Sequence, residues 1–196
     1  MTGHRVIRER RAFLRRHRVS ASCAVVAIAA SMLAGCSTRS ARPPAPTAGP
    51  DPVDISEFAT RPCALLPPDP AAHAGLAPPG TVRTTVTGTS SCAWAAADAH
   101  HASAVAAVDP TTGLRDKYPH PEQIAHYAPT VVSGYPAANV EQPTAPQTCT
   151  VTVEPAPHQS LALTATTTPE PRASDPCDQA DQLAGLVIRL LRAGAP

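Results

Sequence analysis

Large apolar side chains are scarce in this chain of 196 residues. Aromatic residues make up 3% of it, with one Trp, three Tyr and two Phe, and much of the 43% hydrophobic content is alanine. Between Cys63 and Arg192, only 26 of 130 residues are Val, Ile, Leu, Phe, Met, Trp or Tyr. A core this lean only modestly outweighs the conformational entropy that is lost on folding. The sequence therefore predicts a single domain that needs covalent cross-links.

Basic residues are scarce beyond residue 36. Seven of the sixteen Lys and Arg residues lie in the first 18 positions, together with one acidic residue, Glu9. The chain after Cys36 has nine basic and fourteen acidic residues, and so a formal charge of −5. Because nucleic acids and anionic lipid surfaces are bound mainly through Lys and Arg, this balance argues against both as partners of the mature domain.

The chain also lacks a strong candidate for a permanent membrane span. Its first apolar run, Val19 to Gly35, has 17 residues and is interrupted by serines, which is short and weak for a spanning helix. Preceded by the basic residues 1–18, this run predicts a signal peptide over residues 1–35. The run ends in Leu33-Ala34-Gly35-Cys36, which closely resembles the bacterial lipobox. We therefore expect cleavage before Cys36 and a lipid on its thiol that holds the chain at the extracytoplasmic face of the cell membrane.

Two alternatives concern this leader. An uncleaved signal anchor with an unmodified cysteine is disfavoured, because position, spacing and flanking residues all fit the lipobox. Arg10-Arg11-Ala12-Phe13-Leu14-Arg15 resembles the twin-arginine export signal, which would imply export after folding. Ordinary secretion is preferred, since Arg16-His17-Arg18 separates that pair from the apolar run.

Residues 36–57 are predicted to be the lipidated cysteine and a flexible tether. Five of the eleven residues from Arg42 to Pro52 are proline, which excludes a helix or a central strand. A linker without a specific partner is preferred here to a proline-rich recognition motif. Residues 58–196 are predicted to form a single disulfide-stabilised extracytoplasmic domain.

Strand and helix signals alternate within residues 58–196. Strands are predicted at residues 81–87, 91–97, 103–108, 130–133, 137–141, 148–154 and 161–167. Early helical stretches are predicted from Cys63 and from Pro70, and a longer amphipathic helix follows the capping residue Asp175. Residues 110–128 are predicted to be a loop or short helix. This order predicts an α+β fold in which helices pack on one face of an antiparallel β-sheet.

Four cysteines remain once Cys36 carries lipid: Cys63, Cys92, Cys149 and Cys177. An exported chain with an even number of cysteines favours two disulfides. Zinc would normally require cysteines two to four residues apart, whereas none here are closer than 28, so no metal or other cofactor is predicted. Three pairings are open, and the spacings of 29, 57 and 28 residues suggest two similar halves, which favours Cys63 with Cys92 and Cys149 with Cys177.

Five short motifs resemble a known family. They are Pro62-Cys63-Ala64-Leu65-Leu66, Cys92-Ala93-Trp94, Gly134-Tyr135-Pro136-Ala137, Cys149-Thr150-Val151-Thr152-Val153 and Asp175-Pro176-Cys177. Their order, with the lipobox upstream, resembles the actinobacterial lipoprotein family known as domain of unknown function 3558. The resemblance covers about residues 57–192 and departs from the family pattern at an insert around residues 114–129. It implies the location and the fold, and it implies no activity.

Candidate chemistry is sparse, and no catalytic residue is predicted. The chain has no Gly-x-Ser-x-Gly, glycine-rich phosphate loop or His-Glu-x-x-His motif. His100 and His101 are interpreted as exposed turn residues, Asp178 and Asp181 as part of a helix start, and Trp94 as a core residue.

Tyr118, Tyr127 and Tyr135 are the best candidates for a binding surface, because they flank the proline-rich loop. The favoured interpretation is a membrane-anchored binding or interaction module that engages an envelope protein or a small ligand. The alternative is an envelope hydrolase or transferase whose site carries no recognised motif.

Overall fold

The computed structural model describes residues 49–85, 88–142, 144–168 and 175–194. The predicted signal peptide, the lipobox and Cys36 lie outside these ranges, as does most of the predicted tether. Among the helices described, none has the length and apolar character needed to cross a membrane.

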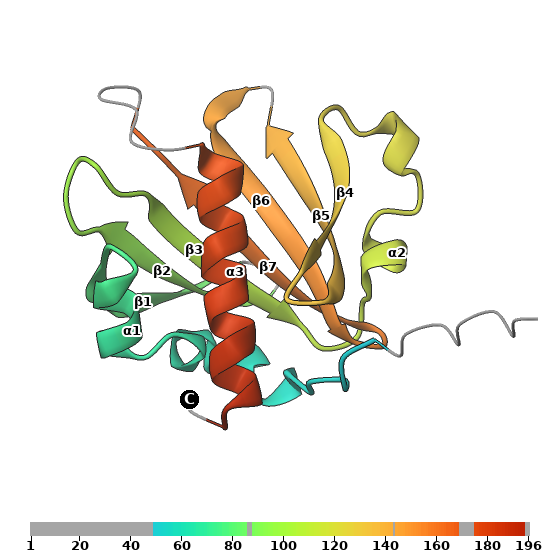
Figure 1. Ribbon diagram of the computed structural model, residues 1–196, viewed down its shortest axis with the longest axis horizontal. Coiled ribbons are helices and arrows are strands. Elements are labelled where there is room, and N and C mark those ends of the chain that lie inside the picture. Colours follow the sequence, from blue (N-terminus) through green and yellow to red (C-terminus); the bar gives the residue numbers. More distant parts are fainter. Residues whose placement is uncertain (1–48, 86–87, 143, 169–174, 195–196) are drawn as a thin grey trace, which may run out of the picture. The chain divides into compact units, whose positions relative to one another are not determined.

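The domain is built on one antiparallel sheet of seven strands in the order β1-β2-β3-β7-β6-β5-β4 (Figure 1). The strands are β1 (Leu76–Thr84), β2 (Ser90–Ala96), β3 (Ser103–Asp109), β4 (Tyr127–Val132), β5 (Tyr135–Gln142), β6 (Ala145–Ala156) and β7 (Gln159–Thr166). All seven predicted strands are confirmed, with bounds that differ by a few residues. The last strand, β7, pairs with β3 and β6 and thereby joins two sequential groups of strands into one sheet.

The two faces of the sheet differ because side chains alternate along each strand. In β3, Ala104, Ala106 and Val108 are buried, whereas Val105 and Ala107 between them are only half-buried. In β6, Val151 and Val153 lie in the core, and Thr152 between them is also buried although it points to the other face. The domain thus has one apolar face covered by helices and one face of mostly small and hydroxyl side chains.

Helix α3 (Pro176–Arg192) covers the apolar face and contacts β6 and β7 (Figure 1). The side chain of Asp175 accepts a hydrogen bond of 2.8 Å from the backbone N–H of Cys177, which confirms the predicted cap. Shorter elements complete the set: α1 (Pro68–His73), α2 (Leu114–Lys117), and the 3-10 helices η1 (Ser56–Ala59), η2 (Pro62–Leu65) and η3 (Pro121–Gln123). The predicted α+β class is confirmed, with strand the larger part.

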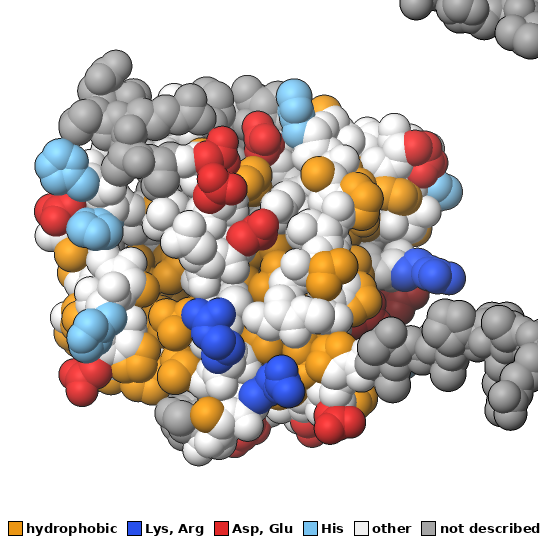
Figure 2. Space-filling model, in the orientation of Figure 1, with side chains coloured by type: hydrophobic (Ala, Val, Ile, Leu, Met, Phe, Trp, Pro, Cys, Tyr) orange, Lys and Arg blue, Asp and Glu red, His pale blue; other side chains and the backbone are white. Residues whose placement is uncertain are grey.

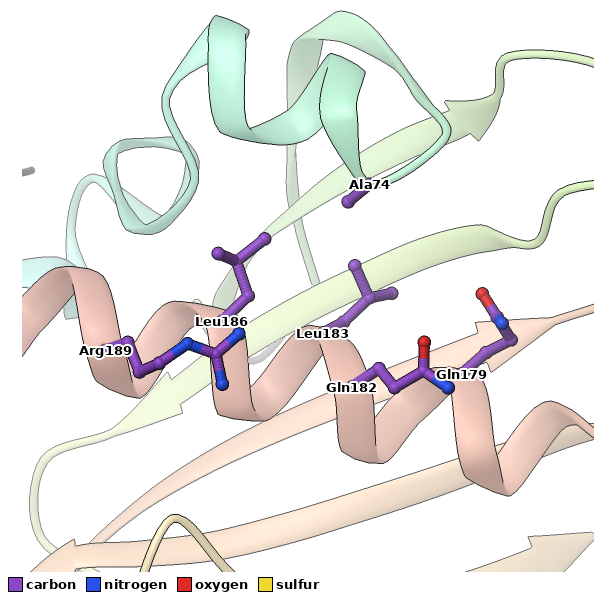
Figure 3. A pocket seen from close by; sticks show the side chains of 6 residues that line it. All are labelled: Ala74, Gln179, Gln182, Leu183, Leu186 and Arg189. Atoms are coloured by element: carbon purple, nitrogen blue, oxygen red, sulfur yellow. The ribbon is translucent and has the colours of Figure 1, made fainter.

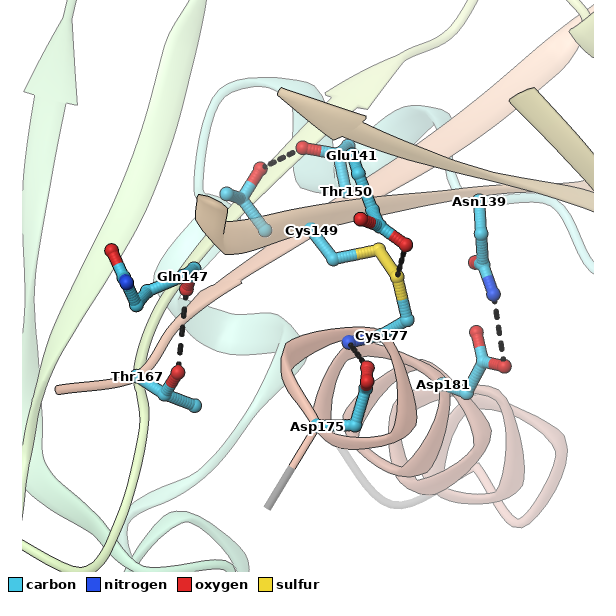
Figure 4. Close-up of a disulfide and its surroundings, with 10 residues drawn as sticks. Asn139, Glu141, Gln147, Cys149, Thr150, Thr167, Asp175, Cys177 and Asp181 are labelled. Atoms are coloured by element: carbon cyan, nitrogen blue, oxygen red, sulfur yellow. Dashed lines mark hydrogen bonds between the residues drawn. A yellow bond between two sulfur atoms is a disulfide. The ribbon is translucent and has the colours of Figure 1, made fainter. Parts of the chain in front are cut away.

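Both predicted disulfides are confirmed. Cys63–Cys92 joins η2 to β2, and Cys149–Cys177 joins β6 to the first turn of α3 (Figure 4). Trp94, two residues after Cys92, is 2% exposed, which confirms its predicted core position. Gly80 of β1 packs against this site so closely that a Cβ atom would overlap Cys92 Sγ and the indole ring. Each disulfide therefore holds a helical element against the sheet.

The folded domain begins earlier in the chain than the sequence suggested. Ile55, which was placed in the tether, is 0% exposed, and its N–H donates to Gln159 Oε1 at 2.9 Å. The N–H of Val53 donates to the carbonyl of Pro155, also at 2.9 Å. This segment crosses the ends of β5, β6 and β7 and closes the core there, so the boundary at residue 57 was wrong. The prolines that suggested a tether are compatible with this extended path.

Candidate ligand-binding groove

The structure brings together two of the three tyrosines proposed for a binding surface. The rings of Tyr118 and Tyr127 are 5.6 Å apart between centroids and meet edge to face, with an interplanar angle of 67°. Tyr135 lies apart from them, because it is 3% exposed and its hydroxyl donates to the carbonyl of Asp51 at 2.6 Å. Tyr135 is therefore a core residue that holds the N-terminal segment rather than a surface residue.

A groove of about 380 Å³ lies beside this tyrosine pair. We call it the tyrosine groove, and its lining residues are Leu114, Arg115, Tyr118, Pro119, Pro121, Tyr127, Pro136 and Glu154. Most of these belong to the segment between β3 and β4, which was predicted to be irregular. The groove therefore lies between this segment and the sheet.

The segment is attached to the sheet by side chains of β6. The hydroxyls of Tyr118 and Thr152 are 2.9 Å apart and hydrogen-bonded. Glu154 Oε2 accepts a hydrogen bond of 3.0 Å from the N–H of Leu114. Gly113 permits this approach, because a Cβ atom there would lie 2.8 Å from Glu154 Oε1. Thr152 and Glu154 alternate with the buried Val151 and Val153, so α2 lies on the face of the sheet opposite α3.

The turn that leads into this segment is fixed by Asp109. Its Oδ1 accepts hydrogen bonds from the N–H groups of Thr111 and Thr112, each at 3.0 Å, and from the Thr111 hydroxyl at 3.1 Å. Partial burial opposes ionisation of Asp109, but these hydrogen bonds outweigh it and lower the pKa of the carboxyl group. Hydrogen bonds to two carboxylates, those of Asp109 and Glu154, thus hold the beginning of the groove-forming segment.

A second depression lies between α1 and α3 (Figure 3). It measures about 290 Å³ and is lined by Ala74, Gln179, Gln182, Leu183, Leu186 and Arg189. The two amides and one guanidinium border a leucine floor, and no acidic or imidazole group is among them. This lining can hold polar groups by hydrogen bonds, but it offers no general base.

The beginning of α3 is acidic, and the end is basic. Figure 2 shows acidic side chains gathered over the start of this helix and basic ones near its end. Asp178 lies in the first turn, and Arg189 and Arg192 lie in the last. This distribution complements the helix dipole, as predicted from the sequence.

The helix dipole does not stabilise a negative charge on Asp181 in the same way, because this residue lies beyond the first turn of α3. Asn139 Nδ2 donates to Asp181 Oδ2 at 3.2 Å (Figure 4), while Asn139 Oδ1 and Asp181 Oδ1 are buried without a hydrogen-bond partner among the described residues. Burial raises the pKa of Asp181, the Asn139 hydrogen bond opposes this, and the charge of Asp178 adds to the rise. The ionised carboxylate is therefore poorly accommodated.

Replacement of Asp181 by Asn is expected to stabilise the domain at neutral pH. An acid whose folded pKa is raised gives its full stability below the unfolded pKa and loses it as the pH rises through the folded pKa. The amide removes this loss and can donate to Asn139 Oδ1, so we expect a gain of about 1 kcal/mol in the free energy of unfolding. Urea unfolding at neutral pH should show this gain in the free energy of unfolding. The gain should shrink at pH values below the pKa of the aspartate in the unfolded chain.

The matched control for this change is Asp178→Asn. Asp178 is exposed in the first turn of α3, where the helix dipole favours a negative charge. We expect no gain from this variant. Equal stabilisation by both variants, or by Asp181→Asn at every pH, would contradict the explanation given for Asp181.

The histidines of the described ranges do not form a catalytic arrangement. His100 and His101 are exposed around Asp98, whose Oδ1 lies 2.7 Å from His101 Nδ1 and accepts from the His100 N–H at 2.8 Å. The hydrogen bond from His101, followed by that from His100, lowers the pKa of Asp98. Within this part of the chain, no hydrogen bond was found between a histidine and a serine, threonine or cysteine, and no cluster suited to a metal ion.

A model of the family described as "Protein of unknown function (DUF3558)" matches residues 31–190. The chain belongs to this family. The matched region of this DUF3558 chain takes in the four residues from Leu33 to Cys36, both disulfides and the tyrosine groove. No significant match was found among curated proteins or among solved structures.

The sequence pointed to part of the tyrosine groove of this DUF3558 chain. Tyr118 and Tyr127 were recognised, whereas Leu114, Arg115, Pro136 and Glu154 were not. One available signal was Glu154, a charged residue that follows the alternating strand residues Val151 to Val153. The place of Glu154 in the groove is evident only in the folded chain, where the segment between β3 and β4 lies over this residue.

Proposed function

We propose that this DUF3558 chain is a lipoprotein that is anchored through Cys36 on the extracytoplasmic face of the cell membrane and presents a binding module there. The leader that ends in Leu33-Ala34-Gly35-Cys36 supports the anchor, and the family match includes these residues. The two disulfides are consistent with an oxidising compartment outside the cytoplasm. An actinobacterial source, which the family resemblance implies, stays a prediction.

The observation that carries the binding role is the tyrosine groove. It combines two aromatic rings, three prolines and a leucine with one basic and one acidic side chain. Its loop is hydrogen-bonded to β6, which favours a preformed surface rather than one assembled on binding. No serine, cysteine or histidine is among its lining residues, so the geometry favours binding of an envelope protein or small ligand over hydrolysis or group transfer.

Replacement of Cys36 by Ser is expected to abolish lipid attachment. The thioether to the diacylglyceryl group requires the thiol, and each buried methylene of the acyl chains contributes about 0.8 kcal/mol to anchoring. Labelling with a radioactive fatty acid and intact mass of the purified chain would measure the loss. Cys23→Ser is the control and should retain full labelling, whereas labelling that survives Cys36→Ser would rule out this anchor.

The binding role is tested separately by photo-cross-linking in intact cells. A benzophenone side chain replaces Arg115, which lines the groove and is exposed, or Val82 of β1, which is 54% exposed and lies outside it. We expect a discrete adduct from position 115 and none from position 82. Absence of an adduct at 115, or the same adducts from both positions, would count against the groove as the binding site.

A further inference from the structure

We propose that the tyrosine groove binds a proline-rich segment of another protein, about five residues long, in the polyproline II conformation and with a basic residue beside its prolines. This inference rests on the binding role proposed above and names the chemistry of the ligand. It also extends the binding surface beyond the groove to Val131, an exposed residue of β4.

The lining of the groove has the chemistry that recognises such a helix. A polyproline II helix is extended, has no internal hydrogen bonds and docks its proline rings into grooves lined by aromatic side chains. The rings of Tyr118 and Tyr127 form the aromatic part of the lining. The hydrogen bond between the Tyr118 and Thr152 hydroxyls fixes the position of one of these rings. A rigid ligand therefore meets a rigid surface, and little conformational entropy is lost on binding.

The apolar surface continues from the groove along β4. Val131 is 65% exposed and lies directly opposite Pro136 of β5, which lines the groove. Because side chains alternate along a strand, Tyr127, Pro129 and Val131 project from one face of the sheet, the face of Pro136. From Tyr127 to Val131 this face extends about 13 Å. Five residues of a polyproline helix span about 12 Å from the first to the last, which sets the length of the ligand.

Strand β4 is the edge strand beside the groove, but it is poorly suited to pairing with an added strand (Figure 1). Positive φ angles at Ser133 and Gly134 identify a two-residue turn of type I′. The residues on either side of such a turn, here Val132 and Tyr135, are hydrogen-bonded to each other. Pro129, three residues before Val132, therefore has its backbone toward the open edge, where it offers no N–H. This edge favours a ligand that needs no ladder of backbone hydrogen bonds.

Charge complementarity favours a basic residue next to the prolines of the ligand. Glu154 is the acidic residue of the lining and is half-buried. Its Oε2 accepts the hydrogen bond from the Leu114 N–H, whereas its Oε1 accepts none from the residues that the structure describes. An arginine of the ligand can pair with this side of the carboxylate. The formal charge of −5 after Cys36 also favours a basic partner.

The proposal is tested by titrating the full-length protein, purified from its own envelope, with a fluorescent peptide. The peptide consists of Pro-Pro-Ala repeats with an arginine at each end, so that either direction of binding brings an arginine to Glu154. We expect saturable binding that Val131→Ala weakens about fivefold. Glu154→Gln should weaken it about tenfold.

The matched control is Val82→Ala. Val82 is 54% exposed, as an apolar residue comparable to Val131, and it belongs to β1 at the opposite edge of the sheet. We expect this variant to bind the peptide as tightly as the unsubstituted chain. Thermal unfolding measured alongside shows whether each variant keeps the fold. Equal weakening by Val82→Ala and Val131→Ala would overturn the extension of the site along β4.

The three tyrosines report where the peptide binds when the protein is labelled with fluorotyrosine. We expect the ¹⁹F signals of Tyr118 and Tyr127 to shift during the titration. The signal of Tyr135 should stay in place, because this residue is buried on the other face of the sheet. A shift of Tyr135 alone would place the peptide elsewhere and overturn the proposal.

The competing ligands each predict a different result. Tighter binding of a peptide with glutamates in place of its arginines would show that Arg115, not Glu154, selects the ligand, and would overturn the basic partner. Equal binding of a Thr-Val repeat peptide would indicate strand addition. ¹⁹F shifts that depend on protein concentration alone would assign the surface to a second copy of the chain. If the proline peptide does not bind, the ligand chemistry is wrong, while cross-linking from position 115 still judges the proposed function.

Discussion

Replacement of Cys63, Cys92, Cys149 and Cys177 by alanine is expected to leave the domain largely unfolded. The disulfides span 29 and 28 residues, and loops of this length contribute about 3–4 kcal/mol each by restricting the unfolded chain. Together they approach the whole stability of a small domain, which is about 5–15 kcal/mol. The core cannot replace them, because many of its buried residues are alanine.

The two disulfides can be tested separately. Each double substitution, Cys63→Ala/Cys92→Ala or Cys149→Ala/Cys177→Ala, is expected to reduce the free energy of unfolding by about 3 kcal/mol in urea titrations. Cys23→Ala serves as the control, because this cysteine belongs to the predicted leader. A four-alanine variant with an unchanged urea midpoint would show that the core alone holds the fold.

Ile55→Ala is expected to have the second largest effect, a loss of about 2–4 kcal/mol. Truncation of a fully buried isoleucine removes apolar contacts and leaves a cavity. Ile55 is 0% exposed and lies three residues before Phe58, which is 2% exposed. The effect would show that the domain includes residues assigned by the sequence to a flexible tether.

The control for Ile55 is an exposed apolar residue. Val131 of β4 is 65% exposed, so Val131→Ala should change stability by about 0.5 kcal/mol or less. Thermal unfolding of both variants under the same conditions measures the contrast. Similar melting temperatures for the two variants would mean that Ile55 does not pack in the core, and the tether would then extend to residue 57.

Much of the fold follows from local patterns. The alternation of residues 103–108 is visible in the sequence, and Asp175 with Pro176 marks the start of α3. The disulfide pairing was suggested by the similar spacing within two halves of the chain. Strand order was not predicted, because pairing of β3 with β7 depends on residues more than fifty positions apart.

The candidate site was predictable only in part. Tyr118 and Tyr127 are only nine positions apart, with Tyr118 directly after α2 and Tyr127 at the start of β4. Glu154 and Pro136 join them because β6 and β5 are paired and the segment folds over both strands. Tyr135 resembled the other two in sequence, but it points to the opposite face of the sheet. Its neighbours in space are therefore different.

The sequence by itself determined the four cysteines, the acidic balance after Cys36 and the succession of strands and helices, and it predicts the leader. These properties depend on residue type and on neighbours a few positions away. Only the tertiary structure decided where the domain begins and which tyrosines share a surface. The contacts responsible join residues 84 positions apart, in Tyr135 with Asp51, and 104 positions apart, in Ile55 with Gln159. Burial arises from such distant partners, and no local pattern encodes them.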